Sequence, residues 1–390
     1  MRIGIFTNCY HPLVNGVVGA VALLRKGFLE LGHEVHLFAP QVDDYRDGEA
    51  NIHRFPAVNL TPKVKYPVAL PYSPRIARLA GTFSLDILHT HHPFVLGPYA
   101  CRLARRLGIP AVYTFHTQYE QYHHYIPLPG GWVRWATKRQ VAAFCGRVDR
   151  ITTPAQSAIA ILQNYGVDRP VRVIPNPIDL GRFRERDGGK IRVQYGISDR
   201  EKLLINIGRI APEKNLGLLL RAFTGMMADA PQQPVKLMIV GDGPDLIPLK
   251  QQAQALGIAA AVLFTGQVAP EAVPDYLAAA DLFVMTSTTE IKPLAQLEAF
   301  AAGVPIVAVA AAGANDTIRH GVNGLLVPGE EGAIRSQIAA LLGEEARLRQ
   351  FRESARQTAA AYSYREIAAS YLELFTETIR QNKGIKEGCS

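Results

Sequence analysis

Short apolar runs rich in Val, Ile and Leu alternate with longer helical patterns along the whole chain. This alternation is typical of βαβ units, in which helices cover a parallel sheet. It occurs in two series, so the sequence predicts an α/β protein with two doubly wound domains that face a central cleft. Strands are predicted at 2–7, 34–40, 86–90, 111–115, 150–153 and 171–174, and then at 202–208, 235–240, 261–265, 282–286, 306–309 and 324–327.

The length also favours two domains, because 390 residues exceed the usual domain size of about 100 to 200. The stretch 175–179 is rich in Pro and a charged stretch follows it, as in many interdomain connections. We therefore expect an N-terminal domain over 1–175 and a C-terminal domain over 176–361. A final helix, about 362–390, is expected to pack back onto the first domain.

Cysteine usage and hydropathy indicate the cellular location of the chain and the kind of membrane contact it can make. Cys9, Cys101, Cys145 and Cys389 have no metal-ligand spacing, and no leader pattern is visible, so we expect a cytoplasmic location. No apolar run reaches the roughly 18 residues that span a bilayer. Membrane contact would therefore be peripheral, on the inner face of the cell membrane.

The net charge of +8 lies entirely in the first half. Residues 1–170 hold 18 Lys and Arg against 10 Asp and Glu, whereas residues 171–390 hold 24 against 24. A one-sided positive field favours an anionic partner, and a charge that serves only solubility is the alternative. The chain shows no RNP-like, helix-turn-helix or zinc pattern, so nucleic acid is not expected as the partner.

Four loops at predicted strand ends carry candidate functional residues. In the first, Gly16 and Val17 open a helix whose N–H groups can face a diphosphate, although a glycine in a turn is often only a turn. In the second, Arg209 and Lys214 follow a buried strand. They can neutralise a diphosphate without a metal, and a surface ion pair with Glu213 is the alternative.

The third loop holds two carboxylates, Glu290 and Glu298, on either side of the predicted helix start at Pro293 and Leu294. Carboxylates accept hydrogen bonds from ribose and hexose hydroxyls, and the helix N-terminus offers N–H donors. Solvated helix charges are the alternative.

The fourth group is a set of histidines, which comprises His89, His91, His92 and His116. No acidic ligand completes a metal set around them, so we expect no metal site. A histidine at a strand end more often bonds a substrate or a neighbouring loop.

These motifs together resemble glycosyltransferase family 4, a large retaining family with two Rossmann-like domains in the glycosyltransferase B fold. The likeness spans nearly the whole chain. It rests on the Gly16 loop and on the stretches 115–117, 174–179, 208–214, 240–244 and 290–298, of which the carboxylate pair is the most specific.

The resemblance implies a role for each matching residue. Arg209 and Lys214 would grip the donor diphosphate, Glu298 would hold the ribose and Glu290 the transferred sugar. His116 would meet the sugar from the other domain. Transfer would then proceed with retention, without a cofactor or metal, from a nucleotide-sugar substrate. Many members have Gly shortly after the first Glu, where this chain has Lys292 and Pro293, which leaves the sugar less certain.

The resemblance also implies that the N-terminal domain selects the acceptor. Trp132 and Trp135 share a predicted helix with three cations, Arg134, Lys138 and Arg139, a composition found at membrane interfaces. Further cations lie at Lys63, Lys65, Arg75, Arg78, Arg102, Arg105 and Arg106. Burial of both Trp rings in the core is the alternative.

The stretch 115–126 resembles the diacylglycerol α-glucosyltransferases of this family. We therefore expect a hexose, glucose, to move from UDP-glucose to a lipid such as diacylglycerol at an anionic membrane surface. The alternatives are another sugar (galactose, sulfoquinovose or mannose), a soluble acceptor, or a sugar-nucleotide epimerase on the same fold.

Overall fold

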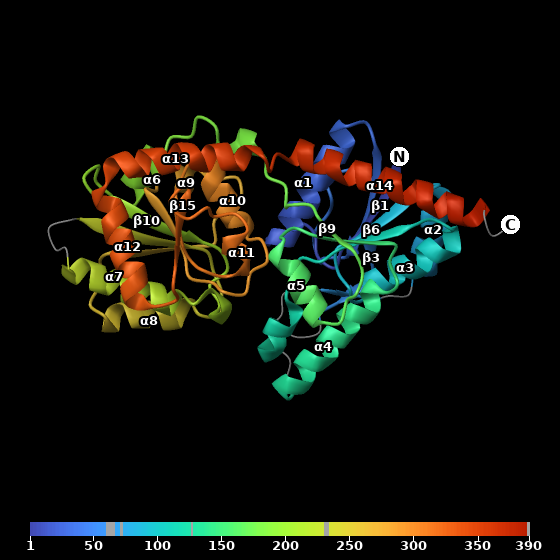
Figure 1. Ribbon diagram of the computed structural model, residues 1–390, viewed down its shortest axis with the longest axis horizontal. Coiled ribbons are helices and arrows are strands. Elements are labelled where there is room, and N and C mark those ends of the chain that lie inside the picture. The colour runs from blue at the N-terminus through green and yellow to red at the C-terminus, as the bar shows by residue number, and fades with distance from the viewer. Residues whose placement is uncertain (60–66, 71–72, 126–127, 230–233, 388–390) are drawn as a thin grey trace. The chain divides into compact units, whose positions relative to one another are not determined.

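The structure, a computed structural model, describes residues 1–59, 67–70, 73–125, 128–229 and 234–387. It separates into two compact units (Figure 1). Unit 1 comprises Met1–Pro177 and Tyr364–Ser390, and unit 2 comprises Ile178–Ser363. The chain therefore passes between the units at two places, next to the boundaries after 175 and 361 that the sequence indicates.

Unit 1 contains a seven-stranded parallel sheet in the order β3-β2-β1-β6-β7-β8-β9. Its strands are β1 (Arg2–Phe6), β2 (Glu34–Pro40), β3 (Ile52–Phe55), β6 (Ile87–Thr90), β7 (Ala111–Thr114), β8 (Arg150–Thr153) and β9 (Val171–Val173). Two short antiparallel strands, β4 (Ala57–Val58) and β5 (Val68–Ala69), form a separate ribbon. The sequence missed β3, β4 and β5, since they are short and their apolar runs are weak.

The helices of unit 1 follow its strands as the βαβ pattern requires. They are α1 (Gly16–Glu30), α2 (Pro74–Thr82), α3 (Leu96–Leu107), α4 (Gly130–Cys145), α5 (Ser157–Asn164) and α14 (Tyr364–Glu387), with the 3-10 segment η1 (Tyr119–Tyr125).

Unit 2 contains a six-stranded parallel sheet in the order β12-β11-β10-β13-β14-β15. Its strands are β10 (Lys202–Ile207), β11 (Val235–Val240), β12 (Val262–Gly266), β13 (Leu282–Met285), β14 (Ile306–Val309) and β15 (Gly324–Val327). Its helices are α6 (Gly189–Gln194), α7 (Leu216–Asp229), α8 (Leu246–Ala255), α9 (Val273–Ala278), α10 (Leu294–Ala301), α11 (Ala312–Asn315), α12 (Glu331–Gly343) and α13 (Glu345–Ala360), with the 3-10 segments η2 (Leu180–Phe183) and η3 (Pro212–Lys214).

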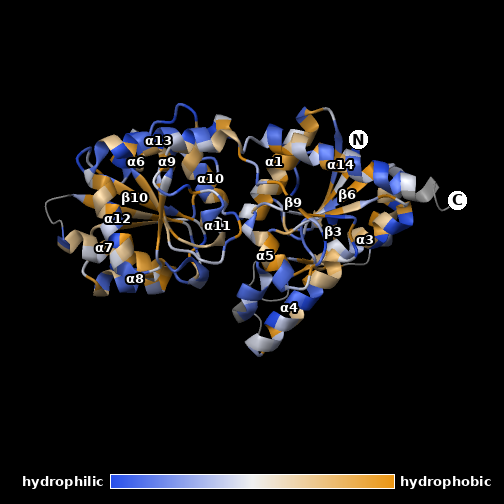
Figure 2. Cartoon of the chain, in the orientation of Figure 1, coloured by the Kyte–Doolittle hydropathy of each residue, from blue (hydrophilic) through white to orange (hydrophobic). Residues whose placement is uncertain are grey.

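Both faces of the unit 2 sheet are covered, which explains its nearly continuous apolar strands. Along β10, Leu204 packs into one hydrophobic core, whereas its neighbours Leu203 and Ile205 pack into the other. Figure 2 shows the apolar strands as orange bands inside each unit. Because the six strands are parallel, their carboxyl ends lie at one edge of the sheet, where the loops can carry functional residues.

The last helix, α14, belongs to unit 1 and packs against α1. A Cβ atom on Gly27 would lie 2.6 Å from the Cβ of Ala368, so the two helices approach closely there. Tyr364 donates a hydrogen bond to Glu30, and the Tyr371 hydroxyl lies 3.1 Å from Thr114 Oγ1 on β7. The described residues include no helix that is long and apolar enough to cross a membrane.

Candidate functional site

Two glycine-containing loops pack against each other at the carboxyl edge of the unit 2 sheet. Gly208 and Gly241 have φ values of +151° and +140°, which only glycine adopts readily. A Cβ on Gly241 would lie 1.9 Å from the carbonyl oxygen of Gly208. Ile210 N also donates to the carbonyl of Asp242 at 2.9 Å. This packing fixes the backbone that carries the exposed side chain of Arg209.

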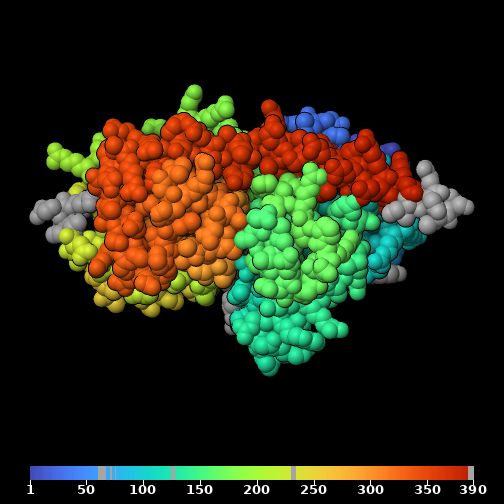
Figure 3. All heavy atoms as spheres, in the orientation of Figure 1, coloured from blue at the N-terminus to red at the C-terminus, as the bar shows by residue number. Residues whose placement is uncertain are grey.

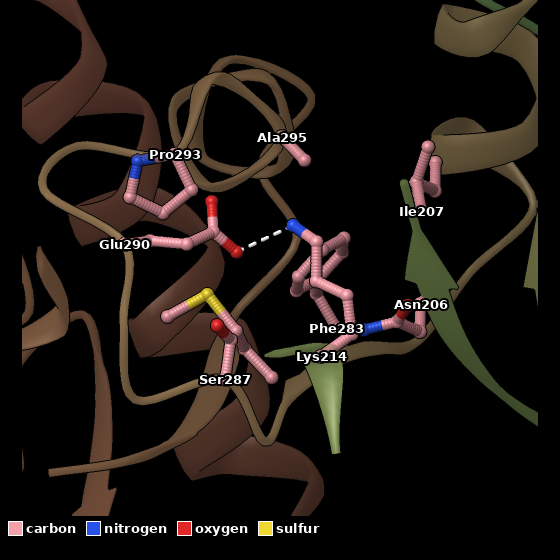
Figure 4. Close-up of a pocket in the computed structure, with 9 residues that line it drawn as sticks. Asn206, Ile207, Lys214, Phe283, Ser287, Glu290, Pro293 and Ala295 are labelled. Atoms are coloured by element: carbon pink, nitrogen blue, oxygen red, sulfur yellow. Dashed lines mark hydrogen bonds and ion pairs between the residues drawn. The ribbon is translucent and has the colours of Figure 1, made fainter. Parts of the chain in front are cut away.

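The turn that carries Lys214 is fastened to the end of β13. Thr286 Oγ1 donates to the carbonyl of Lys214 at 2.8 Å, and Ser287 Oγ donates to that of Glu213 at 3.0 Å. Lys214 Nζ then reaches Glu290 Oε1 at 2.5 Å. Figure 4 shows these two side chains pointing toward each other from different loops. The ion pair of Lys214 is thus with Glu290, and the alternative partner considered from the sequence, Glu213, is not the one observed.

Lys214 and Glu290 line a small pocket at this edge (Figure 4). The other lining residues are Asn206, Ile207, Phe283, Met285, Ser287, Pro293 and Ala295. Pro293 occupies the N-cap position of α10, so the first N–H groups of the helix begin beside the pocket. The pocket therefore combines a cation, a carboxylate and helix N–H donors.

Glu298 lies inside α10, five positions after the helix cap at Pro293. Burial raises the pKa of its carboxyl, and the positive charge of Arg182 on η2 acts in the opposite direction. A carboxylate in such a place favours a ligand that supplies hydroxyl donors, because donors to the charged form offset the loss of water.

Neutral histidines gather at the carboxyl edge of the unit 1 sheet. His91 Nδ1 lies 2.9 Å from His116 Nε2, and His89 Nε2 lies 2.7 Å from Thr114 Oγ1. Burial lowers the pKa of His116 to about 3 and that of His92 to about 4. These imidazoles therefore stay neutral at ordinary pH and act as hydrogen-bonding groups.

The Gly16 loop precedes α1 at the same edge of unit 1. Asn15 caps the helix, since its side chain accepts a hydrogen bond from Val18 N at 2.9 Å. The N–H groups of Gly16 and Val17 lie in the first turn, where no intrahelical acceptor exists. A Cβ on Gly16 would meet no described heavy atom within 4 Å, so the space over this backbone is open to a ligand.

Within the described ranges, no group of three or more His, Cys, Asp or Glu residues is placed to hold a metal ion. His91 lies within hydrogen-bonding distance of His116, and His89 lies within hydrogen-bonding distance of Thr114.

Comparison with known proteins identifies the family. The model for Glycosyltransferase Family 4 matches residues 14–182, and that for Glycosyl transferases group 1 matches residues 187–358. The alpha-monoglucosyldiacylglycerol synthase of Streptococcus pneumoniae is 36% identical over 351 residues, which cover 88% of this chain and 78% of that protein. The chain belongs to glycosyltransferase family 4.

Other proteins share the fold and part of the sequence of this family 4 glycosyltransferase. The GDP-mannose-dependent alpha-mannosyltransferase of Corynebacterium glutamicum is 29% identical, over 84% of this chain and 76% of its own. The Anabaena protein HepE, solved with UDP and glucose, has a TM-score of 0.78 and 20% identity, with 97% and 100% of the two chains covered. The glycosyltransferase B fold expected from the sequence is thus confirmed, and the chain is a hexosyltransferase.

The structure of the glycosyltransferase brings only part of the expected donor set into the pocket. Lys214, Glu290 and Pro293 line it, whereas Arg209, Leu294 and Glu298 lie on the same loops and helix without lining it. Gly16, Val17 and His116 belong to unit 1. The roles of all these residues stay predictions.

Sequence reasoning missed Asn206 and Ser287, which also line the pocket. Asn206 is the only polar residue between Leu203 and Ile207 of β10, and this break in an apolar strand was a usable signal. Its side chain donates to the carbonyl of Val284 at 2.8 Å, which links β10 to β13. Ser287 could be found only from the fold, because its partner lies on another loop.

Helix α4 of the glycosyltransferase protrudes from unit 1 and forms the green lower part of the space-filling view (Figure 3). Its two tryptophans lie on its surface. Trp132 is 58% exposed and Trp135 is 57% exposed, so the alternative that both are core residues is wrong. Arg134 and Arg139 are exposed beside them, and the Arg139 guanidinium lies 5.7 Å from the Trp135 ring centroid.

The remaining basic residues expected from the sequence lie only partly within the described chain. Arg102, Arg105 and Arg106 are exposed on α3, and Arg78 is exposed on α2. Lys63, Lys65 and the side chain of Arg75 lie outside the described residues.

Proposed function

We propose that the chain transfers glucose from UDP-glucose to diacylglycerol at an anionic membrane surface, with retention of configuration and without a metal. The observation that carries the proposal is the likeness to a diacylglycerol glucosyltransferase over 88% of the chain. The charged pocket of unit 2 supports the donor assignment, and the exposed surface of α4 supports the membrane assignment.

The donor phosphates are assigned to the cationic side of the unit 2 pocket. Arg209 can fork onto two phosphate oxygens, and Lys214 adds a point charge. The N-terminus of α10 supplies N–H donors of the kind that bind anions. These groups stabilise the negative charge that develops on the leaving diphosphate, which is the task of a metal ion in other transferases.

The donor sugars are assigned to the two carboxylates. Glu298 accepts hydrogen bonds from the ribose hydroxyls, and Glu290 accepts them from the transferred hexose. In the free protein Glu290 is held by Lys214. When the donor binds, Lys214 therefore leaves the Glu290 carboxylate and pairs with the diphosphate.

The reaction breaks the bond between the anomeric carbon and the diphosphate oxygen and forms one to the acceptor hydroxyl oxygen. The acceptor proton passes to the leaving diphosphate, so no protein nucleophile is required. His116, neutral because burial lowers its pKa, contributes a hydrogen bond and no charge.

The acceptor side is assigned to unit 1. The exposed Trp132 and Trp135 of α4 can enter the interface of a bilayer, and Arg134 and Arg139 can meet anionic head groups. The charge excess of the first 170 residues has the sign that such a surface requires.

Mass spectrometry of lipid products tests the proposal. The full chain is incubated in EDTA with vesicles of anionic phospholipid that contain diacylglycerol. UDP-glucose, UDP-galactose and GDP-mannose are supplied separately, and Arg209→Ala is the inactive control. We expect monoglucosyldiacylglycerol from UDP-glucose, with an α-anomeric signal by NMR. A mannosyl or galactosyl lipid would overturn the sugar assignment. UDP release without a lipid product would overturn the acceptor assignment.

A further inference from the structure

Lys292 is a buried cation beside the pocket. It lies in the loop between β13 and α10, two residues after Glu290 and directly before Pro293, and its side chain is only 7% exposed. The nine residues that line the pocket do not include it. Its ammonium contacts other parts of unit 2 instead.

The ammonium of Lys292 bonds to two segments from elsewhere in unit 2. Nζ donates to Thr317 Oγ1, just after α11, and to the Tyr362 hydroxyl at 3.4 Å, just after α13. It also lies 4.8 Å from the centroid of the Tyr362 ring. One side chain thus ties the Glu290 loop to two otherwise separate parts of the unit.

Tyr362 lies where the chain leaves unit 2. Its carbonyl accepts a hydrogen bond from Ile178 N at 2.8 Å, and Ile178 also forms a β-bridge with Ser363. These residues adjoin the two crossings between the units. Lys292 therefore links the Glu290 loop to the backbone at which the chain leaves unit 2.

The loop is held from its other side as well. A Cβ on Gly313 would lie 2.4 Å from the carbonyl oxygen of Glu290, so α11 packs directly on the loop backbone. Lys214 holds the Glu290 carboxylate on the pocket side. Removal of Lys292 would leave this loop with one cationic anchor in place of two.

A buried charge at position 292 is not explained by stability alone. Burial of an ammonium is unfavourable, and an apolar side chain of similar length would avoid that cost. Burial lowers the pKa of Lys292 to about 8, against the opposing effect of Asp316. The unfolded chain holds this proton to higher pH, so the charged side chain lowers stability below about pH 8, and stability rises as pH rises above it.

We propose that Lys292 is a positioning residue, which holds Glu290 and the start of α10 in the geometry that receives the donor sugar, through its bonds to Thr317 and Tyr362. This inference rests on the proposed function, because it takes Glu290 as the contact of the transferred sugar. The phosphate contacts of Arg209 and Lys214 depend on it less.

The charge of Lys292 should then appear in the pH dependence of the reaction. The ionisable groups around it are Asp316 and Tyr362, with Arg319 acting on Tyr362. Burial raises the pKa of Tyr362, so this phenol stays neutral in the assay range. As pH rises through about 8, the ammonium of Lys292 becomes a neutral amine, whose hydrogen bonds to Thr317 and Tyr362 are weaker, so the loop is held less firmly. We expect kcat/KM for the UDP-sugar to fall there.

The test compares Lys292→Met, which keeps the length, with Lys292→Arg, which keeps the charge. For Lys292→Met we expect KM for the UDP-sugar to rise about tenfold, since small misplacement of a positioned group has large kinetic effects. The inhibition constant of UDP should change less than about threefold, as its phosphate contacts remain. Lys292→Arg should recover most of the activity and lose the fall near pH 8.

Thermal unfolding and Thr317→Val separate positioning from simple structural support. At pH 7 the melting temperature of Lys292→Met should equal or exceed that of the wild type, because the buried charge is gone. Thr317→Val removes a hydrogen-bond acceptor from the ammonium, which lowers the pKa of Lys292 further and moves the alkaline fall of kcat/KM to lower pH.

The proposal is overturned if Lys292→Met keeps the wild-type KM, or if Thr317→Val leaves the pH profile in place. If Lys292→Met does not fold, Lys292→Arg and Thr317→Val still decide it. Failure of the donor assignment, on which this inference rests, looks different: the wild type would then release no UDP from any UDP-sugar.

Discussion

The carboxyl edges of the two parallel sheets have similar backbone architecture, but one edge carries charged side chains and the other carries neutral ones. In unit 2 this edge carries charges, with Lys214 and Glu290 paired at 2.5 Å. In unit 1 it carries imidazoles that burial keeps neutral, with His91 and His116 joined at 2.9 Å. Under the proposed function, the charged edge suits a diphosphate, whereas the neutral hydrogen-bonding groups suit an uncharged sugar or hydroxyl.

The glycines at the two edges also differ, in how closely their surroundings pack against them. Gly241 is required by the close contact with Gly208, whereas Gly16 faces open space. One edge is a tightly packed platform that presents fixed charges, and the other keeps its helix start accessible. The two edges can therefore be tested with matched substitutions.

The largest expected effect comes from the charged groups of unit 2. Arg209→Ala and Glu298→Gln should each lower kcat/KM for the UDP-sugar by about 100- to 1000-fold, the usual loss for one group that stabilises developing charge or holds the substrate. Steady-state kinetics and far-UV circular dichroism check activity and folding together. Near-normal turnover in either variant would remove the donor site from this edge.

The second effect is on stability and compares the two glycines. Gly241→Ala should lower the free energy of unfolding by about 3 kcal/mol, because alanine must adopt a positive φ and its Cβ meets the Gly208 carbonyl. Gly16→Ala, at the first residue of a helix, should change it by less than about 0.5 kcal/mol. Equal urea midpoints for the two variants would contradict the comparison.

The third effect is on the neutral edge. His116→Ala should lower kcat about tenfold, the loss of one neutral hydrogen bond. Because burial lowers the pKa of His116 to about 3, the imidazole stays neutral throughout pH 5 to 8. The pH profile of kcat for the wild type should therefore show no titration near pH 6.5 that disappears in His116→Ala. Observation of such a titration would show that His116 titrates and acts as an acid or base.

The smallest effect concerns α4. Replacement of Trp132 and Trp135 by Ser should weaken binding to anionic vesicles about fivefold and change the free energy of unfolding by less than about 0.5 kcal/mol, since both rings are exposed. Ile247→Ser on α8 of unit 2, where the side chain is 69% exposed, is the matched control. Vesicle sedimentation at two salt concentrations measures both, and equal losses for the two variants would exclude α4 as the docking helix.

Apolar periodicity predicted the parallel strands of both sheets apart from β3, because strands buried on both faces are continuous apolar runs. The short strands β3, β4 and β5 leave too weak a pattern to be seen. The family resemblance also grouped Lys214 with Glu290 as donor-binding residues, and the structure pairs their side chains.

Side-chain pairing across loops could not be predicted. Lys214 pairs with Glu290 and not with its sequence neighbour Glu213. This pairing depends on the hydrogen bonds by which Thr286 and Ser287 orient the turn. Lys292 was visible only as a departure from the family pattern, and its partners Thr317 and Tyr362 are distant in sequence. The exposure of Trp132 and Trp135 was likewise undecided until the burial of α4 was known.

Calorimetric titration of UDP into the full chain in EDTA tests the central claim most directly, because it isolates the diphosphate from sugar and lipid. The account predicts binding by the wild type that EDTA does not weaken, and a loss of at least tenfold in affinity in Arg209→Ala, with His116→Ala close to the wild type. Binding that requires a divalent metal, or that survives in Arg209→Ala and fails in His116→Ala, would contradict it.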